Sequence, residues 1–164
     1  MRIDDRSPDS TPDVSGLRVA VARSLFNSSV TGGLLEGALA WLDDAGVASV
    51  TVVDVPGSFE LPLVAQALAG DHDAVVALGA VIEGETDHYG HVAGRTSEGL
   101  MQVMLATGVP VSFGVLTVRV PAHAVERSAP GPGNKGAEAA AAATLTAALL
   151  RDLADLRHLA DVAD

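Results

Sequence analysis

"DAVVALGAVI", residues 73–82, is the stretch that decides the fold of this chain. After Asp73, every residue of the run is apolar or glycine, and the run has the usual length of a strand. A strand with one wet face would alternate apolar and polar residues, whereas an uninterrupted apolar run is typical of a strand covered on both faces. The stretch therefore predicts a central strand of a parallel sheet.

Strand-like and helix-like segments alternate on both sides of this run. Three further strands, also expected to be buried on both faces, are predicted over residues 17–22, 47–55 and 109–117. Helices are predicted over residues 34–45, 60–70, 91–107 and about 133–159, with Thr31 as a candidate cap for the first. The alternation predicts an α/β fold, in which right-handed crossovers place helices on both faces of a four-stranded parallel sheet.

The composition limits the classes of function. The 164 residues carry a formal net charge of −11, which argues against non-specific binding of DNA or RNA. The chain has no cysteine, so disulfides, thiolate catalysis and cysteine-ligated zinc are excluded, and a cytoplasmic enzyme is expected. No apolar stretch has the length of a membrane helix. Residues 1–16 read as a polar, disordered tail, and residues 17–164 as a single domain.

Ligands of parallel sheets bind beyond the carboxyl ends of the strands, and polar segments follow each predicted strand. After residues 73–82 comes "EGETDHYGH", in which Gly84, Glu85 and Thr86 offer backbone N–H groups to an anion such as phosphate. The alternative is an ordinary turn with Thr86 as a helix cap, and the tripeptide alone favours it. His88 is either a proton-transfer group or an exposed histidine, and no third ligand accompanies His91 to suggest a metal site.

Aromatic side chains have two interpretations at the other strand ends. Phe26 follows the first strand, where it would stack on a planar heterocycle or plug the end of the sheet. Phe59 and Phe113 are core residues by default. Glu60 would accept hydrogen bonds from ligand hydroxyls, or would simply interact with a helix dipole.

Two of the ten lysines and arginines stand just before and at the start of the last predicted helix. Arg127 would bind a phosphate through two hydrogen bonds and Lys135 would add a point charge, although the pattern around each residue alone favours a plain surface charge. From the residues alone, we expect an acidic α/β enzyme with a planar, hydroxylated ligand at the strand ends, and whether that ligand carries a phosphate stays open.

Six segments, taken together, resemble the lumazine synthase family in their order and spacing. They are "FN" (26–27), "VPGSFELP" (55–62), "DAVVALGAVIEGETDHY" (73–89), "GVPVSFGVLT" (108–117), "AVERS" (124–128) and "GNKGAEAA" (133–140). The resemblance implies a flavodoxin-like three-layer α/β/α fold with a four-stranded parallel sheet. It also implies condensation of 5-amino-6-(D-ribitylamino)uracil with 3,4-dihydroxy-2-butanone 4-phosphate, without a metal or cofactor. The product is 6,7-dimethyl-8-ribityllumazine, a precursor of riboflavin.

The resemblance also assigns residues to roles. His88 transfers protons and Lys135 assists, while the substrates are bound by Phe26, Asn27, Ser58, Phe59, Glu60, Val81, Ile82, Gly84, Glu85, Thr86, Phe113 and Arg127. Among these, Phe26 stacks on the pyrimidine, Ser58 and Glu60 hold the ribityl chain, and Arg127 joins the 84–86 segment at the phosphate. In the family, each site lies between neighbours of a pentamer, so that Phe113, Arg127 and Lys135 come from the adjacent subunit.

Several positions depart from the family pattern. Glu83 stands where an arginine is usual, Gly90 replaces an acid, His91 is unusual, and "TVRVPAHA" (117–124) replaces a more polar stretch that contains an acid. These departures leave an alternative function open: a divergent paralogue that binds or stores a flavin or lumazine, or acts on a related ribityl heterocycle. The sequence also leaves open whether pentamers stay single, pair into decamers or build a sixty-subunit shell.

Overall fold

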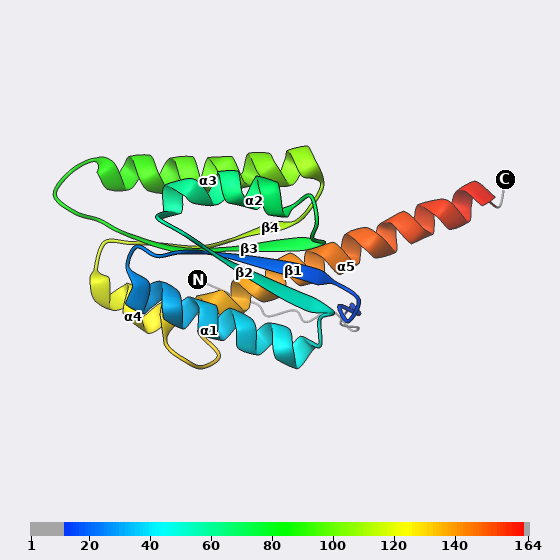
Figure 1. Ribbon diagram of the computed structural model, residues 1–164, viewed down its shortest axis with the longest axis horizontal. Coiled ribbons are helices and arrows are strands. Elements are labelled where there is room, and N and C mark those ends of the chain that lie inside the picture. The colour runs from blue at the N-terminus through cyan, green and yellow to red at the C-terminus, as the bar shows by residue number, and fades with distance from the viewer. Residues whose placement is uncertain (1–11, 163–164) are drawn as a thin grey trace, which may run out of the picture.

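The computed structural model describes residues 12–162, which form one parallel sheet between two layers of helices (Figure 1). The strand order is β2-β1-β3-β4, and β3, the strand predicted to be central, pairs with β1 on one side and β4 on the other. This is the α/β architecture predicted from the sequence. The strands are β1 Arg18–Ser24, β2 Ser49–Val55, β3 Ala74–Ile82 and β4 Val111–Val118, and the helices are α1 Ser28–Ala45, α2 Leu61–Leu68, α3 His88–Thr107, α4 Pro121–Ser128 and α5 Lys135–Val162.

The helices divide between the two faces of the sheet, with α2 and α3 on one side and α1, α4 and α5 on the other (Figure 1). Alternate residues of β3 enter the two cores, since Val76 and Leu78 pack with α1 and α5 while Val75 and Ala77 pack with α2 and α3. This alternation within a wholly apolar strand is the reason that the run has no polar residue. Because β3 is fixed from both faces, the loop at its carboxyl end has a rigid base.

The edge strand β2 does not match the expectation of burial on both faces. Val50 and Val52 remain 38% and 43% exposed, and most of the strand is open to solvent. The strand pairs with β1 alone. Its many valines therefore reflect the preference of valine for strands more than the burial of the strand. The prediction of double burial was therefore wrong for this strand.

Three helix predictions also need correction. Helix α1 begins at Ser28, and Thr31 lies buried inside it with no partner for its hydroxyl, so Thr31 is not the cap. Asn27 occupies that position in the left-handed region, with a φ of 58°. Helix α3 begins at His88 instead of residue 91, which places the side chain of His88 in the first turn of the helix. The segment after β4, predicted as a polar connection, contains the short helix α4, whose first residue is Pro121.

Most of the polar tail predicted over residues 1–16 lies outside the described residues. Within its described part, Val14 is buried in the core beside α1 and α5, and the backbone carbonyl of Asp13 accepts a hydrogen bond from Arg151. At the other end of the chain, the second half of α5 projects beyond the body of the domain (Figure 1). No helix within residues 12–162 is long and apolar enough to cross a membrane.

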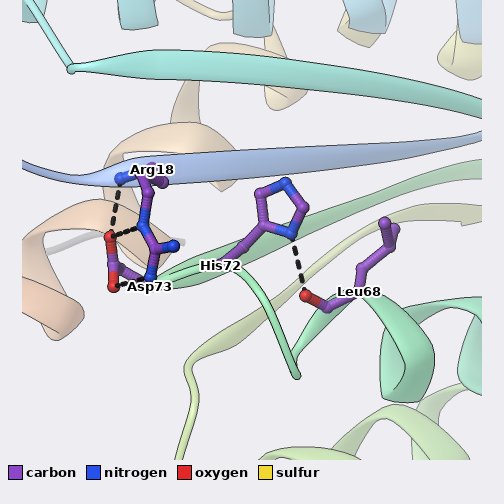
Figure 2. A network of polar contacts seen from close by, with 4 residues as sticks. All are labelled: Arg18, Leu68, His72 and Asp73. Atoms are coloured by element: carbon purple, nitrogen blue, oxygen red, sulfur yellow. Dashed lines mark hydrogen bonds and ion pairs between the residues drawn. The ribbon is translucent and has the colours of Figure 1, made fainter.

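A polar network joins the amino ends of β1 and β3 (Figure 2). The carboxylate of Asp73 accepts hydrogen bonds from the backbone N–H of Arg18 at 2.7 Å and from its guanidinium at 3.2 and 3.3 Å. His72, the neighbouring residue, bridges the carbonyl of Leu68 and the hydroxyl of Thr51, at 2.9 and 3.0 Å. The hydrogen bond from the Arg18 side chain is the main cause that lowers the pKa of Asp73. The network therefore stabilises the end of the sheet opposite the polar loops.

We expect Asp73→Asn to lower the free energy of unfolding at pH 7 by about 1 kcal/mol, a modest value because the pair is partly exposed. A lowered pKa in the folded state contributes stability above the unfolded pKa of about 4, and that contribution is lost as the pH falls through the folded value. The difference between the two proteins should thus shrink below about pH 4. Urea unfolding at several pH values measures it. The exposed Asp71→Asn serves as the control, and an equal effect of both changes at pH 7 would contradict the assignment.

Candidate active site

Two hollows contain most of the residues that sequence analysis singled out. The first, the β3–α3 hollow, has a volume of about 250 Å³ and lies at the carboxyl end of β3. Its walls are Phe26, Ser58, Ala80, Val81, Ile82, Gly84, Thr86, His88, Tyr89 and Val92. The second, the β4–α5 hollow, has a volume of about 430 Å³ and runs along β4 beside the start of α5.

The loop between β3 and α3 forms one wall of the β3–α3 hollow. Gly84 and Thr86 line the hollow, and His88 begins α3 with its side chain exposed to solvent. Asp87 occupies the N-cap position without a side-chain hydrogen bond, so the interpretation of Thr86 as a cap is wrong. Because no side chain caps α3, the backbone N–H groups of His88 and Tyr89 remain available to a ligand, whereas that of Gly90 donates to the carbonyl of Asp87.

Ser58 lies deep in the β3–α3 hollow. It is 5% exposed, and its carbonyl accepts a hydrogen bond at 3.0 Å from the hydroxyl of Thr96 on α3. A Cβ on Gly79 would come within 2.5 Å of the Ser58 hydroxyl oxygen, so a larger residue in β3 would displace the serine. Glycine at position 79 is therefore required by the close approach of the short 3-10 helix Ser58–Glu60 to the sheet.

The two phenylalanines near this hollow, Phe26 and Phe59, are open to solvent. Phe26 is 70% exposed and lines the hollow, which fits a stacking surface better than a plug for the sheet. Phe59 is 57% exposed and lines neither hollow, so its interpretation as a core residue was wrong. Asn27 also lines neither hollow. Its side-chain amide donates to the carbonyl of Ala80 at 2.9 Å and so fixes the position of Phe26 against β3.

The β4–α5 hollow holds the two cations predicted near the last helix. Arg127 and Lys135 line it together with Phe113 and Glu138. The ammonium group of Lys135 lies 2.8 Å from both carboxylate oxygens of Glu138, and Arg127 donates to the carbonyl of His123 at 3.1 Å. Phe113 is 46% exposed, because β4 is an edge strand, and its interpretation as a core residue was also wrong.

Asn134 holds together the turn between α4, which carries Arg127, and α5, which begins at Lys135. It is 2% exposed, and its amide donates to the carbonyls of Gly33, Ser128 and Ala129 at 3.0 to 3.1 Å. Its side-chain oxygen accepts from the backbone N–H groups of residues 136 and 137, which caps α5. The turn "GNKG" carried this signal, since an asparagine directly before a helix is a preferred cap, but sequence analysis missed it.

We expect Asn134→Ala to lower the free energy of unfolding by about 2 kcal/mol, because it removes a cap and leaves buried carbonyl groups without donors. Urea unfolding at fixed protein concentration measures the change. Asn134→Asp keeps the acceptor that caps α5 and turns a carboxylate toward three carbonyl oxygens, so it should destabilise at least as much. If the aspartate variant were as stable as the parent, the cap alone would account for the role of Asn134.

Most of the predicted site residues thus fall into two groups, one in each hollow, and no residue lines both hollows. Seven of them line the β3–α3 hollow and three, Phe113, Arg127 and Lys135, line the β4–α5 hollow. Asn27, Phe59, Glu60 and Glu85 line neither of the two. Beyond the predicted set, Tyr89 and Glu138 lie in the hollows, and within residues 12–162 no group of three histidine and acidic side chains is arranged to hold a metal ion.

Comparisons with known proteins give one consistent family. The family model described as 6,7-dimethyl-8-ribityllumazine synthase matches residues 16–151. A protein of that name from Kineococcus radiotolerans is 48% identical over 93% of this chain and 96% of its own length. Those from Thermus thermophilus and Mycobacteroides abscessus are 57% and 49% identical, over 76% and 88% of this chain and 82% and 91% of their own lengths. All six segments that resembled this family lie within residues 16–151, and the chain therefore belongs to the 6,7-dimethyl-8-ribityllumazine synthase family.

Proposed function

We propose that this chain catalyses the condensation of 5-amino-6-(D-ribitylamino)uracil with 3,4-dihydroxy-2-butanone 4-phosphate to 6,7-dimethyl-8-ribityllumazine, in riboflavin biosynthesis. The observation that carries the proposal is the β3–α3 hollow, where seven of the predicted residues, from three separate segments of the sequence, surround one space. In this hollow the exposed ring of Phe26 stacks on the pyrimidine. Ser58 holds the ribityl chain with Glu60, Phe59 and Asn27 at its margin, and the main chain of Val81 and Ile82 meets the polar edge of the pyrimidine ring.

The phosphate binds at the loop between β3 and α3. The backbone N–H groups of residues 84–86, and those of His88 and Tyr89 in the first turn of α3, are donors that do not exchange their protons with the substrate. The guanidinium of Arg127 completes this site with charge-assisted hydrogen bonds. Binding of the phosphate therefore leaves the nearby imidazole free for proton transfer.

His88 moves protons at the steps that form and break bonds. The 5-amino nitrogen adds to the ketone carbon of the butanone, and the carbonyl oxygen leaves as water. Loss of a proton from the neighbouring carbon then expels the phosphate. Finally the ribitylamino nitrogen closes the second ring with loss of another water. An imidazole can both accept and donate a proton, which suits a sequence of such transfers.

Each complete site is shared between adjacent subunits of a pentamer. Support for this arrangement comes from the separation of Phe113, Arg127 and Lys135 from the residues of the β3–α3 hollow in one chain. In the assembly, the β4–α5 hollow of one subunit faces the β3–α3 hollow of its neighbour. Lys135, paired with Glu138, then acts beside the phosphate as an assisting charge. The cytoplasmic location expected from the sequence remains a prediction.

The experiment that tests the function mixes the purified protein with both substrates and follows the absorbance and fluorescence of the lumazine. Formation at a rate proportional to enzyme concentration, well above the reaction without protein, is the expected result. If no product forms at high enzyme concentration while lumazine still binds tightly, the protein is a binder or store instead of an enzyme.

A further inference from the structure

An open hollow lies on the other side of the loop between β3 and α3. It has a volume of about 620 Å³, and its walls are Glu83, Thr86, Asp87, Tyr89, Gly90, His91 and Arg119. Thr86 and Tyr89 line both this hollow and the β3–α3 hollow, so the loop and the first turn of α3 separate the two spaces. A charge in the open hollow therefore acts electrostatically, across the loop, on a phosphate bound at residues 84–86 and does not contact it.

The loop itself is an unfavourable place for a dianion. Glu83, Glu85 and Asp87 are all exposed and lie within four residues of one another, in a chain whose formal net charge is −11. Each uncompensated carboxylate beside the phosphate lowers its affinity. A cation from another element is needed to offset this field.

Arg119, the first residue after β4, supplies such a cation. The parallel pairing of β3 and β4 continues to Ile82 and Val118, and the N–H of Glu83 then donates to the carbonyl of Val118 at 2.9 Å. Glu83 and Arg119 leave the sheet side by side as a result. The Nε atom of Arg119 lies 3.3 Å from a carboxylate oxygen of Glu83.

We propose that Arg119 is a positioning residue for the phosphate of the butanone substrate, which acts by neutralising the Glu83 carboxylate at the edge of the 84–86 loop. This inference rests on the proposed function.

Four proteins test this role: the parent chain, Arg119→Gln, Glu83→Gln and the double variant. We expect Arg119→Gln to raise KM for the phosphorylated butanone about two- to fivefold, the range for an exposed ion pair, with kcat and KM for the pyrimidine unchanged. The double variant should return KM close to the parent value, because the uncompensated carboxylate is gone. The effect of Arg119→Gln should also shrink in 0.5 M NaCl, since added salt screens exposed charges.

Other outcomes would overturn the proposal. If the double variant stayed as impaired as Arg119→Gln, Arg119 would contact the phosphate itself, and if Arg119→Gln had a normal KM, the pair would be a surface ion pair only. The matched control is Arg95→Gln, which breaks an exposed pair with Glu98 on α3 and should leave KM unchanged. Calorimetric titration with inorganic phosphate gives the same comparison without turnover. A protein that bound phosphate in the predicted order but formed no lumazine would support this inference and contradict the proposed function.

Discussion

Replacing Arg127 with alanine is expected to lower kcat/KM for the phosphorylated butanone by roughly 10²-fold, the effect of losing a charge-assisted, two-point contact with a phosphate. Within the described chain, the guanidinium donates only to the carbonyl of His123, in its own short helix, and approaches Glu126 at 3.7 Å. Arg127 thus contributes little to the stability of the isolated fold. No other side chain that lines the β4–α5 hollow can bind a phosphate through two parallel hydrogen bonds. KM for the pyrimidine should change little.

The lysine variant separates charge from geometry. Arg127→Lys keeps a positive charge but loses the planar fork of donors, so we expect roughly a tenfold loss, between the parent and the alanine variant. Steady-state kinetics with each substrate varied in turn give both KM values, and thermal unfolding confirms that the proteins are folded. An alanine variant within threefold of the parent kcat/KM would remove Arg127 from the site.

The fold followed from the sequence because β3 is an unusually clear signal. Nine residues without a charged or polar side chain leave few alternatives to a strand buried on both faces, and a helix then follows each strand. Edge positions gave no comparable signal. Val50, Val52 and Phe113 are as apolar as the residues of β3, but they lie on strands with one neighbour each, and apolar character alone does not tell what covers a side chain.

Short-range effects explain the other differences between expectation and structure. The glycine pair at residues 32 and 33 hid the start of α1 from sequence analysis, because glycine disfavours a helix interior. Gly33 is nevertheless needed there, since the backbone of Ser128 packs against it and a Cβ would collide with the carbonyl oxygen of Ser128. Helix α4 buries only Ala124 and Ser128, which is too little for a periodic apolar pattern. The pairing of Glu83 with Arg119 depends on strand register, and nothing in the spacing of the two residues indicates it.

Proteins that contain both His88→Ala and Arg127→Ala subunits are expected to recover activity that neither variant has alone. His88→Ala by itself should lower kcat roughly 10²-fold, the lower end for a general acid–base group, because water can partly replace the exposed histidine. If each site takes its β3–α3 hollow from one subunit and its β4–α5 hollow from the next, random assembly of equal amounts leaves about a quarter of the sites with both residues intact. The mixed protein should then reach about a quarter of the parent activity.

A second mixture shows whether recovery depends on the separation of the two hollows. Phe26 lines the same β3–α3 hollow as His88, so a mixture of Phe26→Ala and His88→Ala subunits contains no intact hollow of that kind and should not recover. Co-expression with two affinity tags and purification through both gives assemblies that contain each variant. The first mixture could instead have only the average activity of the two single variants. His88 and Arg127 would then act within one subunit, and a conformational change would have to bring the two hollows together. Recovery in the first mixture alone means that a single folded chain holds only half of each site, which makes assembly a requirement for turnover.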